Sequence, residues 1–309
     1  MVPLRKMPQP DLVDLHVHSS VSDGLLSPRD LVRYAREAGL RAIAITDHDT
    51  VAGAAEALAA GREFGLEVIP GVEISAEVSP GACHILGYFI DPADRALVRL
   101  LDEARTGRDR RNRRILRRLR RLGMPLAMAE LSAGTEGGVL TRAHFATAMI
   151  EKGYVKSWDE AFERYLGRGR PAYAARRRVG PAEAIRAIHG AGGLAVLAHP
   201  RQLDRSPAET DKFIESLARA GLDGVETHSP DHTANLARRY RAASRRLGLV
   251  ETGGTDWHGY REGAGHSRDR HVRIHLGVGR GSMAVHYDLV EGMKARLAAR
   301  RSNRPAQSP

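Results

Sequence analysis

Residues 14–24, DLHVHSSVSDG, are the most informative stretch of this sequence. Apolar residues indicate a buried strand, and His16 and His18 are interleaved with them. Side chains alternate between the two faces of a strand, so both imidazoles point to the same side and can bind one cation. Asp23 follows shortly after the strand and adds a carboxylate.

Short apolar segments alternate with segments of helical periodicity over most of the chain. The segments expected to form strands lie near residues 12–15, 42–46, 67–74, 84–88, 194–198, 224–227 and 249–252. A capping residue followed by proline favours a helix start, and such pairs stand at residues 27–28, 180–181 and 206–207. Asp49 or Thr50 is expected to cap a further helix, which Gly65 ends. Strands that alternate with helices predict a parallel sheet, and seven such units predict a closed or nearly closed α/β barrel.

Histidines and carboxylates gather where these strands are expected to end, and His84 stands where one begins. The segments that carry them are ITDHDTVAG (45–53), GVEIS (71–75), HILGY (84–88), LAHP (197–200), ETH (226–228) and GTDWHG (254–259). In a parallel barrel these ends converge on one face, where active sites form. Histidine, aspartate and glutamate without thiolates suit Zn²⁺, Mn²⁺ or Fe²⁺. So many residues of this kind predict more than one ion, which favours hydrolysis of a phosphate ester.

Composition excludes several classes of protein. The chain has 309 residues, of which 42% are hydrophobic, so it is not disordered as a whole. A single cysteine excludes an intramolecular disulfide and a multi-cysteine metal site. Without a membrane-length apolar run or a secretory signal, we expect a cytoplasmic protein with no membrane partner. The net charge of +11 fits an anionic partner, such as a nucleotide or nucleic acid, and equally a compositional drift toward arginine.

Residues 106–176 interrupt the alternation of strands and helices. They hold several helical patterns and no clear strand, so we expect a helical insertion into a barrel formed by residues 11–105 and 177–300, with a disordered tail at 301–309. Ten arginines in residues 105–121 surround an apolar stripe at helical spacing. This helix either guides an RNA strand, with affinity that falls steeply with salt, or presents a solvated face while its stripe packs on the barrel.

In their order along the chain, these motifs resemble the polymerase and histidinol phosphatase (PHP) family. The resemblance covers about residues 11–88 and 193–259 and implies a distorted (β/α)7 barrel with two to three divalent metal ions. It implies nine ligands: His16, His18, Glu73 and Asp256 for the first ion; Asp23, His48 and His199 for the second; and a bridging Glu73, His84 and His258 for the third. Every ligand position is filled, which is typical of catalytic members.

Three parts of the insertion, at residues 141–146, 151–153 and 165–173, are similar to the nucleotide-phosphatase branch of that family. The resemblance implies a hydrolase that acts on phosphate monoesters of nucleotides, either nucleoside 3′,5′-bisphosphates or 5′-monophosphates. Attack would come from a hydroxide that bridges two metal ions. The alternative is a 5′→3′ exoribonuclease or oligonucleotidase, a phosphodiesterase, with the same site. A histidinol-phosphatase-like enzyme and a non-catalytic nucleic-acid-binding module are less favoured. The expected partner is a small nucleotide or short RNA, with no obligate protein partner.

Two further groups of residues are assigned roles. Asp47 and His199 are candidates to protonate the leaving group, and Glu73 is placed with them as the bridging carboxylate. Asp14 is expected to orient a ligand histidine. Arginine forks match pairs of phosphate oxygens, and the residues expected to contact substrate are Arg142, His144, Arg168, Arg170, Arg201 and His232. For Arg168, Arg170 and Arg201, an exposed surface position is an equally good interpretation.

Overall fold

The computed structural model describes residues 11–76, 78, 83–132, 140, 142–175, 179–259, 274–281 and 283–302. It contains a seven-stranded sheet in the order β1 to β7. The strands are β1 (Val13–Val17), β2 (Ala42–Ile45), β3 (Glu67–Ala76), β4 (Cys83–Tyr88), β5 (Leu194–Leu197), β6 (Gly224–His228) and β7 (Val250–Gly253). Backbone pairing of Val17 and His18 with Trp257, just after β7, brings the two edges of the sheet together. The predicted strands and the nearly closed α/β barrel are therefore confirmed.

The prediction of an all-parallel sheet is wrong at β4. This strand runs antiparallel to both β3 and β5. Only a few residues separate β3 from β4, whereas a crossover between parallel strands needs a dozen or more. The reversal has a consequence for the site, because β4 begins at the edge where the other strands end. His84, at the start of β4, therefore lies on the same face as the other predicted ligands.

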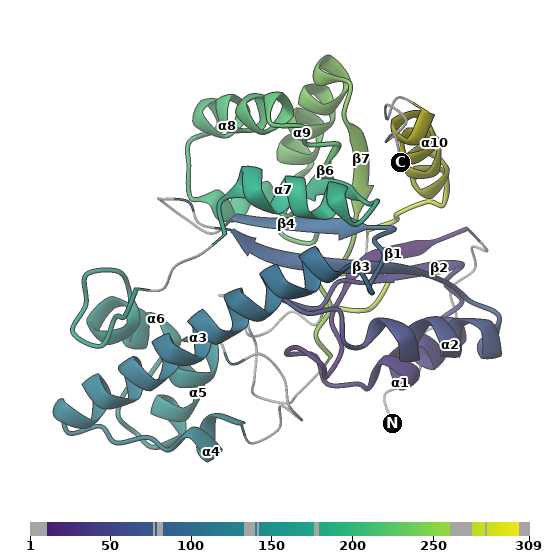
Figure 1. Cartoon of the computed structure of the whole chain (residues 1–309). Coiled ribbons are helices and arrows are strands. Elements are labelled where there is room, and N and C mark those ends of the chain that lie inside the picture. The colour runs from purple at the N-terminus through teal and green to yellow at the C-terminus, as the bar shows by residue number, and fades with distance from the viewer. Residues whose placement is uncertain are drawn as a thin grey trace.

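Helices surround the strands of the barrel (Figure 1). They are α1 (Pro28–Glu37), α2 (Ala54–Phe64), α7 (Pro181–Gly190), α8 (Pro207–Arg219), α9 (Ala234–Leu247) and α10 (Asp288–Ser302), with a 3₁₀ turn, η2 (Pro200–Leu203), after β5. The predicted Ser-Pro starts are confirmed, since Ser27 and Ser206 each accept a backbone N–H of the first helical turn. The predicted cap of α2 is wrong. Gly53 precedes that helix, and Asp49 instead binds β3 and α3.

The inserted segment forms its own apolar core. It consists of α3 (Arg95–Arg121), α4 (Met128–Ser132), α5 (Arg142–Glu151), α6 (Trp158–Ala161) and a π-helical turn, η1 (Phe162–Leu166). The first half of α3 packs into the barrel through Leu97 and Leu101, and its second half packs against α5 through Ile115 and Leu119. We call that second half, with α4, α5, α6, η1 and the turn at residues 167–170, the insertion lobe. Figure 1 shows it beside the edge where β3 ends and β4 begins.

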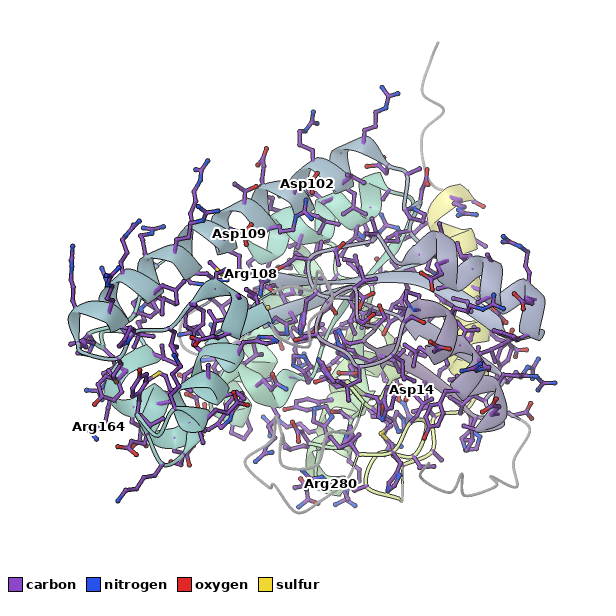
Figure 2. The ribbon with its side chains drawn as sticks, turned by 90° about the horizontal axis from the view of Figure 1, so that it is seen from below. Asp14, Asp102, Arg108, Asp109, Arg164 and Arg280 are labelled. Carbon is purple, nitrogen blue, oxygen red and sulfur yellow. The ribbon has the colours of Figure 1, made fainter. Side chains whose placement is uncertain are left out.

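The cationic helix is only partly as expected. Of its apolar stripe, Ile115, Leu116 and Leu119 pack within the insertion lobe rather than on the barrel, whereas Leu122 is exposed. Eight of the ten arginines are exposed, whereas Arg108 and Arg111 are buried. Figure 2 shows long side chains that extend away from the outer edge of α3. The predicted boundary at residues 105/106 falls inside this continuous helix, and the division into domains stays a prediction.

The C-terminal helix is attached to the end of the barrel opposite the predicted ligands. The carboxylate of Asp223, just before β6, is fully buried and accepts hydrogen bonds from Arg296 and Arg300 of α10. The prediction of a disordered tail from residue 301 is wrong at Arg301 and Ser302, because α10 extends to Ser302. Later residues lie outside the described ranges. Within those ranges, no helix combines the length and the apolar character that crossing a bilayer requires.

Replacing Asp223 by Asn is expected to lower the free energy of unfolding by about 1–3 kcal/mol at neutral pH, as for other buried hydrogen-bonded groups. Burial raises the pKa of Asp223, but hydrogen bonds from His189 and the Ala195 N–H outweigh it and hold the pKa below its ordinary value. The ionised carboxylate therefore stabilises the fold above about pH 3.9, the ordinary value, and less as pH falls through the lower folded pKa. Denaturant unfolding at pH 7 and pH 3 measures the free energy of unfolding of the variant and of the wild type. A difference in this free energy that is as large at pH 3 as at pH 7 would contradict the stabilising role of the ionised carboxylate.

Candidate metal centre

All nine predicted ligands lie in one cluster at the face where the strands converge. The fully buried carboxylate of Glu73, on β3, is its centre. Its oxygens lie 2.8 Å from His48 Nδ1, 2.8 Å from His84 Nδ1 and 3.0 Å from His199 Nε2. The Nε2 atoms of His16 and His18, on and just after β1, lie 3.5 and 3.4 Å from the same carboxylate. One glutamate therefore contacts five imidazoles that come from four parts of the barrel.

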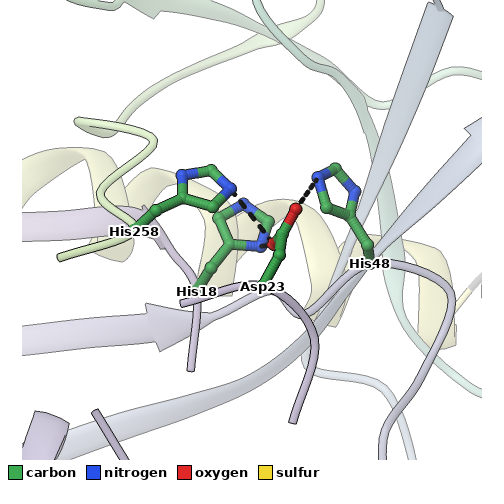
Figure 3. Close-up of side chains that lie close together, drawn as sticks. All are labelled: His18, Asp23, His48 and His258. Carbon is green, nitrogen blue, oxygen red and sulfur yellow. Dashed lines mark ion pairs between the residues drawn. The ribbon is translucent and has the colours of Figure 1, made fainter. Parts of the chain in front are cut away.

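The ligand-type atoms fall into three groups, each with its atoms within 4.8 Å of one another: His16, His18, Glu73 and Asp256; His18, Asp23, His48 and His258; and His48, Glu73 and His84. The first group has the same four members as the predicted first site. The other two differ in membership from the predicted second and third sites, and the assignment of ligands to ions stays a prediction. His258 lies beside Asp23, 3.2 Å from Nε2 to Oδ1 (Figure 3), and His199 lies beside Glu73 and His84. Closure of the barrel between β7 and β1 is the reason, because it brings the segment after β7 to the loop that holds Asp23.

Electrostatics within the cluster keep its carboxylates ionised. Burial raises the pKa of Glu73, but His48, His84 and His16 outweigh it and hold the pKa well below its usual range. Asp23 and Asp256 have lowered pKa values because nearby histidines likewise outweigh burial. Burial and the neighbouring His258 lower the pKa of His18 to about 3. His18 is therefore a neutral imidazole with a free lone pair, which is the form that binds metals.

The residues present fit divalent metal ions. Several buried ring nitrogens and carboxylate oxygens of the cluster approach one another without hydrogen-bond geometry. Among the buried side-chain N and O atoms without a hydrogen-bonding partner in the described part of the chain, six belong to this cluster: His16 Nε2, His18 Nδ1 and Nε2, His48 Nδ1, Glu73 Oε2 and His199 Nδ1. Buried polar atoms are normally paired, so atoms that converge in this way fit a shared ion. Nitrogen and oxygen donors without thiolates agree with Zn²⁺, Mn²⁺ or Fe²⁺.

Glu226, on β6, contacts two residues of the cluster but was not among the predicted site residues. Its Oε1 lies 3.0 Å from His16 Nδ1, and its Oε2 accepts the backbone N–H of His199 at 2.6 Å. A carboxylate that accepts the Nδ1 proton of His16 leaves Nε2, on the side of Glu73, as the ring nitrogen that a metal ion would use. The signal was present, because Glu226 stands near the end of a predicted strand, but many glutamates do so without such a role.

Replacing Glu226 by Gln is expected to weaken metal affinity or activity by about 10- to 100-fold, as for other residues that orient a ligand. His16 Nδ1 and the backbone N–H of His199 both donate a hydrogen bond to Glu226. The oxygen of a glutamine can accept one of these bonds, but its NH₂ group would then face the other donor. With the NH₂ group against His16 Nδ1, the ring proton would have to move to Nε2, which would then have no lone pair for a metal ion. Titration of metal-free protein with Mn²⁺ measures the affinity. A variant that binds Mn²⁺ as tightly as the wild type would remove the role of Glu226 in setting the tautomer.

Two aspartates near the cluster, Asp14 and Asp47, accept hydrogen bonds from backbone N–H groups and hydroxyls of neighbouring segments rather than from an imidazole ring. Asp14 accepts hydrogen bonds from Thr255, from the Gly277 N–H and from the backbone N–H of His16. It therefore positions the segment that leads to Asp256 and the backbone of His16, and a role in orienting a ligand histidine stays a prediction. Asp47 accepts from the hydroxyls of Ser19 and Ser22 and from the Ser19 N–H. These bonds use both of its oxygens and fix the loop that carries Asp23. The catalytic role of Asp47 stays a prediction.

Some residues around the cluster hold unusual backbone angles. Asp49, His199 and Asp256 have positive φ values of 52°, 24° and 55°. Such conformations are costly for residues other than glycine and often mark functional sites. Here they turn the chain sharply where the strands end, so that His48, His199 and Asp256 project into the same space.

The predicted substrate contacts occupy two regions. Arg142 lies in the insertion lobe, where its Nη1 donates to Leu166 O at 3.1 Å and its guanidinium lies 5.6 and 5.8 Å from the Phe162 and Tyr173 ring centroids. The same lobe contains a partly buried His144 and the exposed Arg168 and Arg170. On the barrel, Arg201 donates to Asp231 O at 3.3 Å, and His232 Nδ1 lies 3.2 Å from Thr227 O. Contact of these six with substrate stays a prediction.

Comparison with known proteins agrees with this geometry. A 3′,5′-nucleoside bisphosphate phosphatase from Chromobacterium violaceum is 34% identical over 83% of this chain and 92% of its own length. A 5′-3′ exoribonuclease from Haemophilus influenzae is 36% identical over 79% of this chain and 89% of its own. The solved structure of a protein from Bifidobacterium adolescentis, assigned as a metal-dependent phosphoesterase, is 29% identical, covers 94% of this chain and 98% of its own, and has a TM-score of 0.77.

The model of the family described as "PHP domain" matches residues 14–248 of this chain. This range runs from β1 to the end of α9 and includes the insertion lobe. The strand ends that carry His16, Glu73 and His199 all lie within it. This match and relatives of that identity over most of their own lengths show that the chain belongs to the PHP domain family.

Proposed function

We propose that this protein is a metal-dependent phosphoesterase that removes phosphate from nucleotide monoesters, either nucleoside 3′,5′-bisphosphates or 5′-monophosphates. The class of enzyme, a hydrolase of phosphoric esters, follows from the family. The observation that carries metal-dependent hydrolysis is the set of three ligand groups joined by Glu73 and His18, and the similarity to the 3′,5′-nucleoside bisphosphate phosphatase supports a nucleotide substrate. Two to three ions, Mn²⁺, Zn²⁺ or Fe²⁺, would occupy these groups.

Divalent ions bound here would supply positive charge against the phosphate oxygens and lower the pKa of water. Glu73 and His16 form the buried floor of the site, whereas Asp256 and His84 form a rim with side-chain exposures of 28% and 21%. Substrate therefore has access from the rim side. His199 faces Glu73 and His84 through Nε2, which supports a ligand role for it over that of a proton donor.

The second candidate is a 5′→3′ exoribonuclease with the same site. It is favoured by the similarity to the Haemophilus influenzae relative, whose identity to this chain is comparable with that of the phosphatase relative. The exposed arginines of α3 would suit a longer polyanion. The same metal groups serve either reaction, so the choice depends on what binds beside them.

One substrate panel separates these functions. Purified, Mn²⁺-loaded protein is given AMP, adenosine 3′,5′-bisphosphate, histidinol phosphate and 5′-phosphorylated RNA oligomers, and released phosphate and mononucleotides are measured. Phosphate from mononucleotides with intact oligomers is the expected result, and treatment with a chelator should abolish it until Mn²⁺ is restored. Progressive shortening of RNA would establish the exoribonuclease instead. No turnover of any substrate, with RNA binding that weakens with salt, would overturn both.

A further inference from the structure

Arg108 is a buried arginine in a helix whose other arginines are mostly exposed. Only 4% of its surface is accessible, and buried arginines are rare unless they are paired. Its Nη2 donates to the buried carboxylate of Asp49, and it also lies 3.2 Å from Ser75 Oγ. Figure 2 labels Arg108 near the middle of α3, where the helix leaves the barrel for the insertion lobe.

Both partners of Arg108 adjoin residues of the metal centre in the sequence. Asp49 follows His48 directly, and Ser75 stands two residues after Glu73. Asp49 Oδ1 accepts the Ser75 N–H at 2.8 Å, and the Asp49 N–H donates to Glu73 O at 2.9 Å. These bonds extend the pairing of β2 with β3 past the end of β2. They fix the loop that carries His48 against the strand that carries Glu73.

The position of the loop that carries His48 determines the contact between His48 and Glu73, and two of the three ligand groups include His48. His48 Nδ1 lies 2.8 Å from Glu73 Oε2, and His48 is a member of both the group with Asp23 and the group with Glu73 and His84. Asp49 has a φ of 52°, a conformation that costs free energy and persists only when its surroundings enforce it. The ion pair with Arg108 is the part of those surroundings that comes from α3.

We propose that Arg108 is a positioning residue, which holds the His48 loop through Asp49 and so couples the insertion lobe to the metal centre. The lobe begins on the same helix, so any shift of α3 would move Asp49 and His48. The inference depends on metal binding, and the choice between phosphatase and exoribonuclease does not affect it. A movement of the lobe, which carries four of the predicted substrate contacts, would thereby alter the metal geometry.

A double variant separates positioning from stability. Removing one partner of a buried ion pair leaves an uncompensated charge, whereas replacing both by uncharged residues is often close to neutral. Arg108→Met and Asp49→Asn should each lower Tm, and the double variant should recover most of it. If Arg108 positions His48, the double variant recovers Tm, but its Mn²⁺ affinity and its kcat each remain about 10- to 100-fold below those of the wild type. Its KM should change less than its kcat. Arg108→Lys should be intermediate, because lysine keeps the positive charge, but its shorter side chain would not place a donor where Arg108 Nη2 meets both Asp49 and Ser75.

The matched control is Arg111→Met. Arg111 is also buried and one turn further along α3, but it binds Asn112 and the Leu140 carbonyl within the insertion lobe. This variant should lose stability and retain the Mn²⁺ affinity of the wild type. Recovery of Tm, Mn²⁺ affinity and kcat together in the double variant would overturn the proposal and leave Arg108 with a stabilising role alone. Mn²⁺ affinity is measured without substrate, so this outcome is distinguishable from a wrong assignment of the reaction.

Discussion

Glu73→Gln is expected to abolish phosphate release and to lower the metal content of the purified protein. Glu73 belongs to two of the three ligand groups, and five imidazoles surround it. An amide of the same size has one weaker acceptor and adds an NH₂ group that points at ring nitrogens. Metal polarisation contributes several kcal/mol to such reactions, and each 1.4 kcal/mol is tenfold in rate, so we expect a loss of at least about 10³-fold.

The matched control for this substitution lies on the same strand. Glu67, at the opposite end of β3, pairs with Lys294 and the Tyr287 hydroxyl near the surface. Glu67→Gln should leave metal content and kcat unchanged and shift stability by about 1 kcal/mol or less, as exposed ion pairs do. Metal content by elemental analysis and phosphate release are measured for both variants. Full activity with normal metal content in the Glu73 variant would remove its bridging role.

Gly254→Ala is expected to open the junction that closes the barrel. A Cβ at Gly254 would lie 2.3 Å from His16 Cβ and 2.4 Å from His16 N. His16 cannot retreat easily, because β1 pairs with β2 on one side and with the segment around Trp257 on the other. We expect a loss of about 3 kcal/mol in the free energy of unfolding, at the upper end for overpacking. Metal binding should weaken too, since His16 and Asp256 would separate.

Gly292→Ala is the control for this second prediction. Gly292 lies inside α10, and nothing stands within 4 Å of the position that its Cβ would take. An alanine in a helix interior is more favourable than glycine by about 0.5–1 kcal/mol, so this variant should be slightly more stable. Denaturant unfolding and Mn²⁺ titration are measured for both variants. Wild-type stability in the Gly254 variant would show that β1 and β7 can separate without cost.

The strands could be predicted because short segments rich in buried residues carry a local signal. The nine ligands came from the family resemblance, and the structure brings these residues together at one face; their role as ligands stays a prediction. The direction of β4 was missed, although the short link before Cys83 contained the signal. The grouping of His199 and His258 could not be read from sequence, because it depends on which loops meet across the barrel.

The arginines of α3 likewise separate what the sequence predicts from what only the structure shows. Ten arginines between residues 105 and 121 look alike in the sequence, yet the structure exposes eight of them and buries Arg108 and Arg111. Helical periodicity predicted an inner and an outer face, but a buried arginine on the inner face is stable only if a carboxylate or carbonyl happens to meet it. Asp49 does so for Arg108, from a loop far away in the chain.

By itself, the sequence determined which residues supply imidazole and carboxylate groups and that these stand at the ends of strands, because side-chain chemistry and the alternation of a strand are local properties. Only the tertiary structure decided which of them lie close enough to share an ion, that Glu226 contacts the Nδ1 side of His16, and that Arg108 reaches Asp49. Those contacts join residues that are tens to hundreds of positions apart. They depend on the closure of the sheet and on the path of α3, which no short segment of the chain encodes.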